Sequence, residues 1–200
     1  MNLFVQPATP ARHRPESWCG LGLALALFLA LQGVAQLAPA AVARCFAAPA
    51  AWLAGSYEGI RPQPAGHDGL PAWELESTVG GPLLVTLACS GFTFFSLAAS
   101  LAVARRKHEQ PAGNPGRTVA RALALALALW CLTVSANAVR IVLAGWAHAL
   151  SLAWLSPHFD AVMHEATGLL VFLSALAAWE LWLRRRPRPP QLSPMTQDTP

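Results

Sequence analysis

The chain has 200 residues, of which 54% are hydrophobic and 12% charged, and it carries a net charge of +4. The charged share is about half that of a typical soluble domain, and the length favours a single domain. Long blocks rich in Ala and Leu are typical of membrane helices and argue against a water-soluble protein. The basic residues form no contiguous face, so no nucleic-acid partner is expected.

Four apolar blocks predict transmembrane helices. Each reaches the length of about 20 residues that crosses about 30 Å of hydrocarbon. The predicted spans are 18–38, 79–104, 119–146 and 159–183, and the third is long enough to be tilted or to extend beyond the bilayer. We therefore expect an all-α integral membrane protein, with one transmembrane helical domain at 18–183 that is a bundle of about four helices.

The basic residues predict the orientation of these helices. Most lie before the first span, between or beside the second and third, and after the fourth: Arg12, Arg14, Arg105, Arg106, Lys107, Arg117, Arg121, Arg184, Arg185, Arg186 and Arg188. Only Arg44 and Arg61 lie in 39–78, and none lies in 147–158. Because Lys and Arg accumulate on the cytoplasmic side, both chain ends and the 105–117 loop are expected to face the cytoplasm. The expected location is the cytoplasmic (inner) membrane, which the chain crosses several times.

The segments outside the spans differ in character. Residues 1–17 and 184–200 are rich in proline and basic residues and are expected to form a disordered cytoplasmic lead and tail. An alternative for the N-terminus is a signal peptide cleaved after Ala41-Val42-Ala43, but the apolar run at 18–38 exceeds a signal core of about 7–15 residues and favours an uncleaved helix. The outward segment 39–78 is expected to begin with a short helix at 40–53 lying in the membrane interface. Gly80-Gly81-Pro82 is expected to start the second span, since proline favours the first helical turn.

Three reactive or ionisable residues lie inside the predicted spans: Cys89, Arg140 and His164. A charged side chain within a span costs about 2.5–3.5 kcal/mol on insertion scales, so an arginine there indicates a functional site. Cys89 and His164 each lie seven residues into an inward-running span, counted from Pro82 and Pro157. That is about 10 Å at 1.5 Å per residue, and Arg140 lies near the outer end of the third span. The three residues are thus predicted to share one layer in the outer half of the bilayer.

Their chemistry and neighbours predict a cysteine-nucleophile site. Cys89 would be the nucleophile, Arg140 would stabilise the thiolate or an oxyanion, and His164 would be the base and later the acid. Ser90 and Gly91 are small and allow close approach to the sulfur, Asn137 shares a helical face with Arg140, and Gly168 lies one turn after His164 on the same face. The plainer interpretations are a buried packing cysteine, an arginine that extends to the interface and a solvated histidine.

The other candidate ligands form no site. Cys19, Cys45 and Cys131 are scattered, and the chain has no Cys-x-x-Cys pair or zinc spacing. His148 and His158 are expected to be interfacial. Neither a metal ion nor another cofactor is expected.

Three motifs together resemble the exosortase/archaeosortase family, and the chain is most similar to the short exosortase K type. They are Cys89-Ser90-Gly91 followed by Phe92, Phe94 and Phe95; Asn137-Ala138-Val139-Arg140; and His164 with Gly168 and Phe172. They occur in this order over about 78–180. Typical members have about twice as many spans, so this chain keeps little more than the core.

The resemblance implies a sortase-like cysteine peptidase or transpeptidase, a hydrolase acting near the outer face of the cytoplasmic membrane. The implied partners are membrane-anchored proteins with a C-terminal sorting tail, made of a short motif, a transmembrane helix and a basic cluster. Cys89 would attack a peptide carbonyl of such a protein, and the thioester would pass to an acceptor or to water.

Other functions stay open at this point. Ser90 or Ser135 with His164 could form an intramembrane serine protease. A non-enzymatic membrane subunit could anchor a haem through His148, His158 or His164. A structural or interaction protein would use Arg140 to pair with lipid phosphate or with Asp160.

Overall fold

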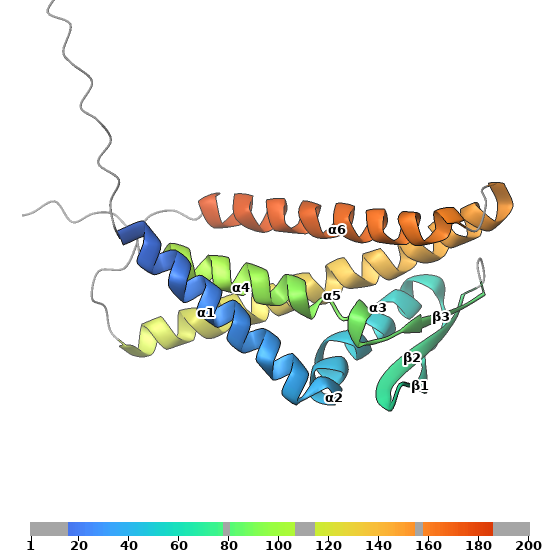
Figure 1. Ribbon diagram of the computed structural model, residues 1–200, viewed down its shortest axis with the longest axis horizontal. Helices are drawn as coiled ribbons and strands as arrows, with labels where there is room; N and C mark the ends of the chain where they lie inside the picture. Colours follow the sequence, from blue (N-terminus) through green and yellow to red (C-terminus); the bar gives the residue numbers. More distant parts are fainter. Residues whose placement is uncertain (1–15, 78–80, 107–114, 155–157, 186–200) are drawn as a thin grey trace, which may run out of the picture.

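The computed structural model describes residues 16–77, 81–106, 115–154 and 158–185, and it is mostly helical (Figure 1). The elements in chain order are α1 (Glu16–Leu37), α2 (Pro39–Val42), the π-helical turn η1 (Ala43–Ala47), α3 (Ala48–Glu58), β1 (Gln63–His67), β2 (Leu70–Ser77), β3 (Gly81–Val85), the 3-10 turn η2 (Leu87–Cys89), α4 (Phe92–Arg106), α5 (Pro115–Trp154) and α6 (His158–Arg185). The disorder predicted for the two chain ends lies outside the described residues, apart from the first turn of α1 and the last of α6.

Three helices of the described part are long and apolar enough to cross a membrane: α1, α5 and α6. They confirm the predicted helices at 18–38, 119–146 and 159–183 to within a few residues at most ends. The exception is α5, whose 40 residues extend about 60 Å at 1.5 Å per residue, well beyond a hydrocarbon layer of about 30 Å. Leucines on all three helices are exposed, as expected for surfaces that face lipid: Leu21, Leu25, Leu29, Leu123, Leu127, Leu169, Leu170 and Leu173.

The prediction of one helix across 79–104 is wrong. Residues Gly81–Val85 form a strand, Leu87–Cys89 form a 3-10 turn, and α4 begins only at Phe92. With 15 residues, α4 extends about 22 Å and falls short of the bilayer. The break occurs at Gly91, whose φ of 72° lies in the left-handed region and cannot continue a right-handed helix.

The mostly helical structure is consistent with the expected all-α membrane protein, but it also contains a three-stranded antiparallel sheet, in the order β1-β2-β3, which was not predicted. Asp68 and Gly69 connect β1 to β2 with φ values of 51° and 74°, which is the pattern of a two-residue hairpin turn. Along β2, Trp73 and Leu75 are buried while Glu74 and Glu76 are exposed. This alternation places one face of the sheet on the core and the other toward solvent.

The helix predicted at 40–53 is present and runs longer, from Pro39 to Glu58 through α2, η1 and α3. In the π-helical turn, the carbonyl of Cys45 accepts a hydrogen bond from the indole Nε1 of Trp130 on α5 at 3.0 Å. The small side chains of this helix let it pack closely on the sheet and on α5. The resulting core contains Ala43, Ala47, Ala50, Ala51, Ala54, Trp73, Leu75, Val85, Val134, Ala138 and Ile141.

The described elements have two distinct ends (Figure 1). The start of α1, the end of α4, the start of α5 and the end of α6 lie at one end, and the sheet lies toward the other. Glu180 of α6 forms ion pairs with Arg105 of α4 and, at 2.8 Å, with Arg184. Among the described residues, Arg105 and Arg184 therefore form an ion-pair cluster with Glu180 where α4 and α6 end.

Candidate functional site

Cys89 is the last residue of η2 and lies just before α4 rather than inside a helix. The N–H groups of Cys89 and Ser90 donate to the carbonyls of Thr86 and Leu87, both at 3.0 Å. The thiol is free and half-buried, and the Thr86 hydroxyl lies 4.0 Å from its sulfur. The turn therefore fixes the main chain of Cys89 and leaves its side chain partly accessible.

Ser90 and Gly91 form the junction between this turn and α4. The buried Ser90 hydroxyl accepts a hydrogen bond from the Phe92 N–H at 3.2 Å, which satisfies one free donor at the helix start. A Cβ on Gly91 would lie 3.2 Å from Cγ2 of Thr133 and 3.5 Å from Cβ of Asn137. Glycine is therefore required here both for its left-handed backbone and for the close approach of α5.

We expect Gly91→Ala to destabilise the fold, because the left-handed conformation costs an L-residue about 1–2 kcal/mol before any steric contact is counted. The measurement is thermal unfolding of the detergent-purified protein. Gly22→Ala on α1 is the matched control, since a Cβ there meets nothing within 4 Å and alanine favours a helix. Equal unfolding midpoints for the two variants would contradict this role of Gly91.

Asn137 on α5 connects this helix to the candidate nucleophile. Its side chain is fully buried, with 0% of its surface exposed, and its Nδ2 donates to the backbone carbonyl of Cys89. Its Oδ1 is also buried and has no hydrogen-bond partner among the described residues. A buried amide is costly unless it is bonded, so the bond to Cys89 fixes the turn on α5.

Arg140 lies three residues after Asn137 and contacts α6. A Cβ on Gly168 would lie only 2.7 Å from Arg140 Nε, so the guanidinium group occupies the space beside that glycine. The Arg140 Cζ lies 5.7 Å from the ring centroid of Phe172, which stacks on Phe94 of α4 at 5.1 Å. The arginine is therefore held between helices, which differs from the alternative of an arginine extended to the interface.

His164 lies on α6 one helical turn before Gly168, so the two positions share a face of the helix. Its side chain is not among those the structure describes. The backbone positions nevertheless show how the three motifs are arranged. Asn137 contacts the Cys89 turn, and Arg140, about one turn further along α5, contacts α6 at the turn next to His164. One short stretch of α5 thus contacts the elements that carry the other two motifs.

The remaining candidates are placed less favourably. Ser135 is exposed on α5, Glu165 is exposed on α6, and Cys45 and Cys131 are exposed. The side chains of His158 and Asp160 lie outside the described set, as does that of Cys19. In the described part of the chain, no group of three His, Cys, Asp or Glu residues could hold a metal ion.

Sequence reasoning missed Thr86 altogether, and it named Phe94 and Phe172 only as motif residues, without a role in the site. Thr86 reaches the cysteine sulfur, and Phe94 and Phe172 form the aromatic contact beneath Arg140. The two phenylalanines were visible only as parts of a motif, because a phenylalanine in an apolar helix predicts packing without identifying its partner. Thr86 gave no signal, since its position depends on the unpredicted turn.

A thiol, a guanidinium and an imidazole on adjoining elements are suited to acyl transfer through a cysteine. Comparisons of this chain with protein-family models, with curated proteins and with solved structures find no match. The contacts described above are therefore the basis on which a function is proposed.

Proposed function

We propose that this chain is a membrane-embedded cysteine peptidase or transpeptidase of the exosortase type. One observation carries the proposal. Asn137 contacts the Cys89 turn, and Arg140, about one turn further along α5, contacts the Gly168 turn of α6. The Cys89 turn and the Gly168 turn, which motif order and predicted depth had grouped, thus both contact the same stretch of α5. A packing cysteine and a lipid-binding arginine would need no such arrangement.

In the proposed reaction, the sulfur of Cys89 attacks a peptide carbonyl carbon and forms a C–S bond. His164 takes the thiol proton and later gives it to the leaving amine as the C–N bond breaks. Arg140 stabilises negative charge on the sulfur or on the carbonyl oxygen. Water or an acceptor amine then attacks the thioester, releases an acid or a new amide, and restores the thiol.

The shape of the bundle supports a site near one membrane surface. Cys89 lies three residues before the start of α4, a helix about 22 Å long whose other end is basic, and so it lies on the side of the sheet. If the basic end is cytoplasmic, the thiol lies in the outer half of the cytoplasmic membrane. Membrane-anchored proteins with a C-terminal sorting tail are the proposed substrates, and the helix of the tail would be released.

The test is to compare the membrane proteins of cells that produce this chain with those of cells that lack it, by mass spectrometry of C-terminal peptides. We expect at least one anchored protein to lose its C-terminal tail only when the chain is produced. The proposal fails if no C-terminal tail is lost while the chain accumulates in the membrane fraction.

A further inference from the structure

A small groove lies beside Cys89, between the tip of the β1–β2 hairpin and residues 86–88. Its volume is about 220 Å³. Leu70 and Pro71 line it from the hairpin, and Leu87 and Ala88 line it from the chain leading to Cys89. Neither wall belongs to the site predicted from the sequence.

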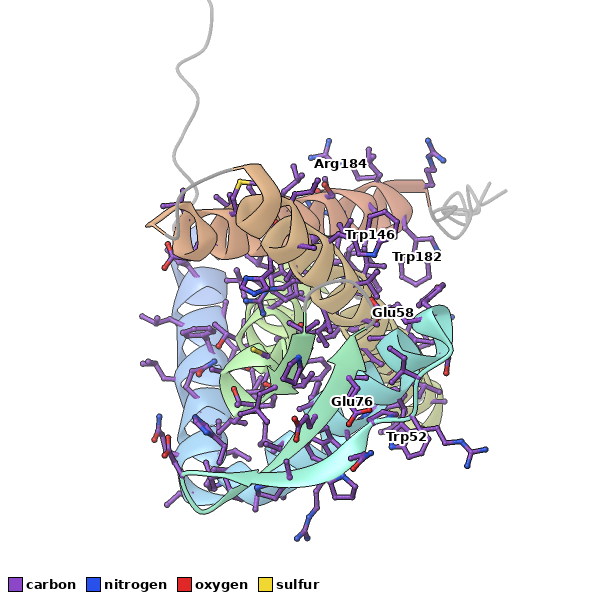
Figure 2. All side chains as sticks on the ribbon, turned by 90° about the vertical axis from the view of Figure 1, so that its right-hand side faces the viewer. Trp52, Glu58, Glu76, Trp146, Trp182 and Arg184 are labelled. Carbon is purple, nitrogen blue, oxygen red and sulfur yellow. The ribbon has the colours of Figure 1, made fainter. Side chains whose placement is uncertain are left out.

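The groove exists because β3 is shorter than β2. Val85, the last residue of β3, is opposite Trp73, whereas β2 begins at Leu70. Residues 70–72 therefore extend beyond the end of β3 and pair only with β1 among the described strands. Figure 2, seen from the end at which the sheet lies, shows the long hairpin crossing this face of the molecule. The groove occupies the place where a longer β3 would continue.

Cys89 does not line this groove, but two of the residues that do are connected to it. Ala88 immediately precedes Cys89, and Thr86, which also lines the groove, reaches the sulfur with its hydroxyl at 4.0 Å. Leu70, Pro71, Leu87 and Ala88 make its walls mainly apolar. His67 and Asp68, whose side chains lie 3.4 Å apart, are exposed at its rim.

We propose that the groove binds an extended segment of the substrate polypeptide and holds one of its apolar side chains next to the bond that Cys89 attacks. This inference rests on the proposed function. The volume is below the range of about 300–1,000 Å³ for small-molecule sites and suits one or two side chains. An extended segment fits because residues 70–72 of β2, which have no partner strand on this side among the described residues, can lie alongside it, although Pro71 has no N–H to donate; the groove provides a pocket for a side chain.

The experiment uses the full chain with Cys89 as its single cysteine, made by changing Cys19, Cys45 and Cys131 to Ser. The probes are acetyl-dipeptide chloromethyl ketones with Leu or Gly at each position, and iodoacetamide serves as the probe without a side chain. In each reaction the sulfur forms a C–S bond and displaces halide, and the rate is followed by intact mass. The rate of each probe is divided by the rate of iodoacetamide. We expect this ratio to be at least about tenfold higher for a leucine probe than for its glycine counterpart, as for an apolar side chain in a fitted pocket.

The matched variants are Leu70→Trp, which fills the groove, and Leu84→Trp, on an exposed part of β3 that does not line it. The leucine preference should be lost in Leu70→Trp and kept in Leu84→Trp. Three results would overturn the groove proposal: the parent protein shows no leucine preference, the preference survives Leu70→Trp, or both variants abolish it. None of these results would contradict the cysteine chemistry. If Cys89 reacts with none of the reagents, the proposed function fails and the groove assignment fails with it.

Discussion

Replacing Cys89 by alanine should abolish processing of a substrate found by the C-terminal comparison. Removal of a covalent nucleophile typically lowers the rate by about 10³-fold or more, because the remaining groups cannot form the acyl intermediate. The measurement is the fraction of the anchored protein that has lost its tail, followed over time in membranes with equal amounts of each variant.

Cys131→Ala is the matched control for this experiment. Cys131 is an exposed cysteine on α5 and lies outside the candidate site, so its loss should leave the rate unchanged. Normal processing by Cys89→Ala would remove the cysteine mechanism. Normal processing by Cys89→Ala with loss in Ser90→Ala would instead favour a serine mechanism.

Arg140→Gln is expected to lower the maximal rate about 10²–10³-fold, the usual effect of removing one group that stabilises a developing anion. Glutamine keeps much of the length and polarity but not the charge. The fall should appear in kcat more than in KM, because the charge that Arg140 stabilises develops only during reaction. Arg140→Lys should restore part of the rate, since it keeps the charge without the planar group.

Gly168→Ala should also lower kcat, but by moving the Arg140 side chain instead of removing its charge. The added Cβ would meet Arg140 Nε at 2.7 Å, so the guanidinium must move while its charge is kept. We expect a lower kcat with normal accumulation of the protein. If Arg140→Gln and Gly168→Ala both lower accumulation but leave the rate per molecule unchanged, Arg140 has only a packing role.

The long helices were predictable because their apolar blocks are long and uninterrupted. The same criterion failed at 79–104, where residues 82–104 contain no charged residue although the first part is a strand. The relevant signals were local: Ser90-Gly91 as a break, and Asp68-Gly69 as a hairpin turn before the alternating Trp73, Glu74, Leu75 and Glu76. Composition averaged over a span hides such signals.

The sequence predicted which residues belong to the candidate site, but not which elements carry them or how those elements contact one another. Depth counted along a helix from Pro82 has no meaning for Cys89, because Pro82 lies in β3 and Cys89 in a 3-10 turn. The shared face of Asn137 and Arg140 did follow from helical spacing. That they contact two different elements, the Cys89 turn and α6, could not, because sequence spacing says nothing about which neighbours a helix has.

The shortness of α4 has a consequence for the surrounding lipid. If α4 crosses the hydrocarbon layer with the three longer helices, its length of about 22 Å in a layer of about 30 Å creates a hydrophobic mismatch, which a bilayer relieves by thinning around the helix. Thinning lowers the headgroups and their water toward the turn that carries Cys89. In a bilayer thinned in this way, water and the main chain of the proposed substrate would reach the thiol from the side, without a pore or gate through the bundle.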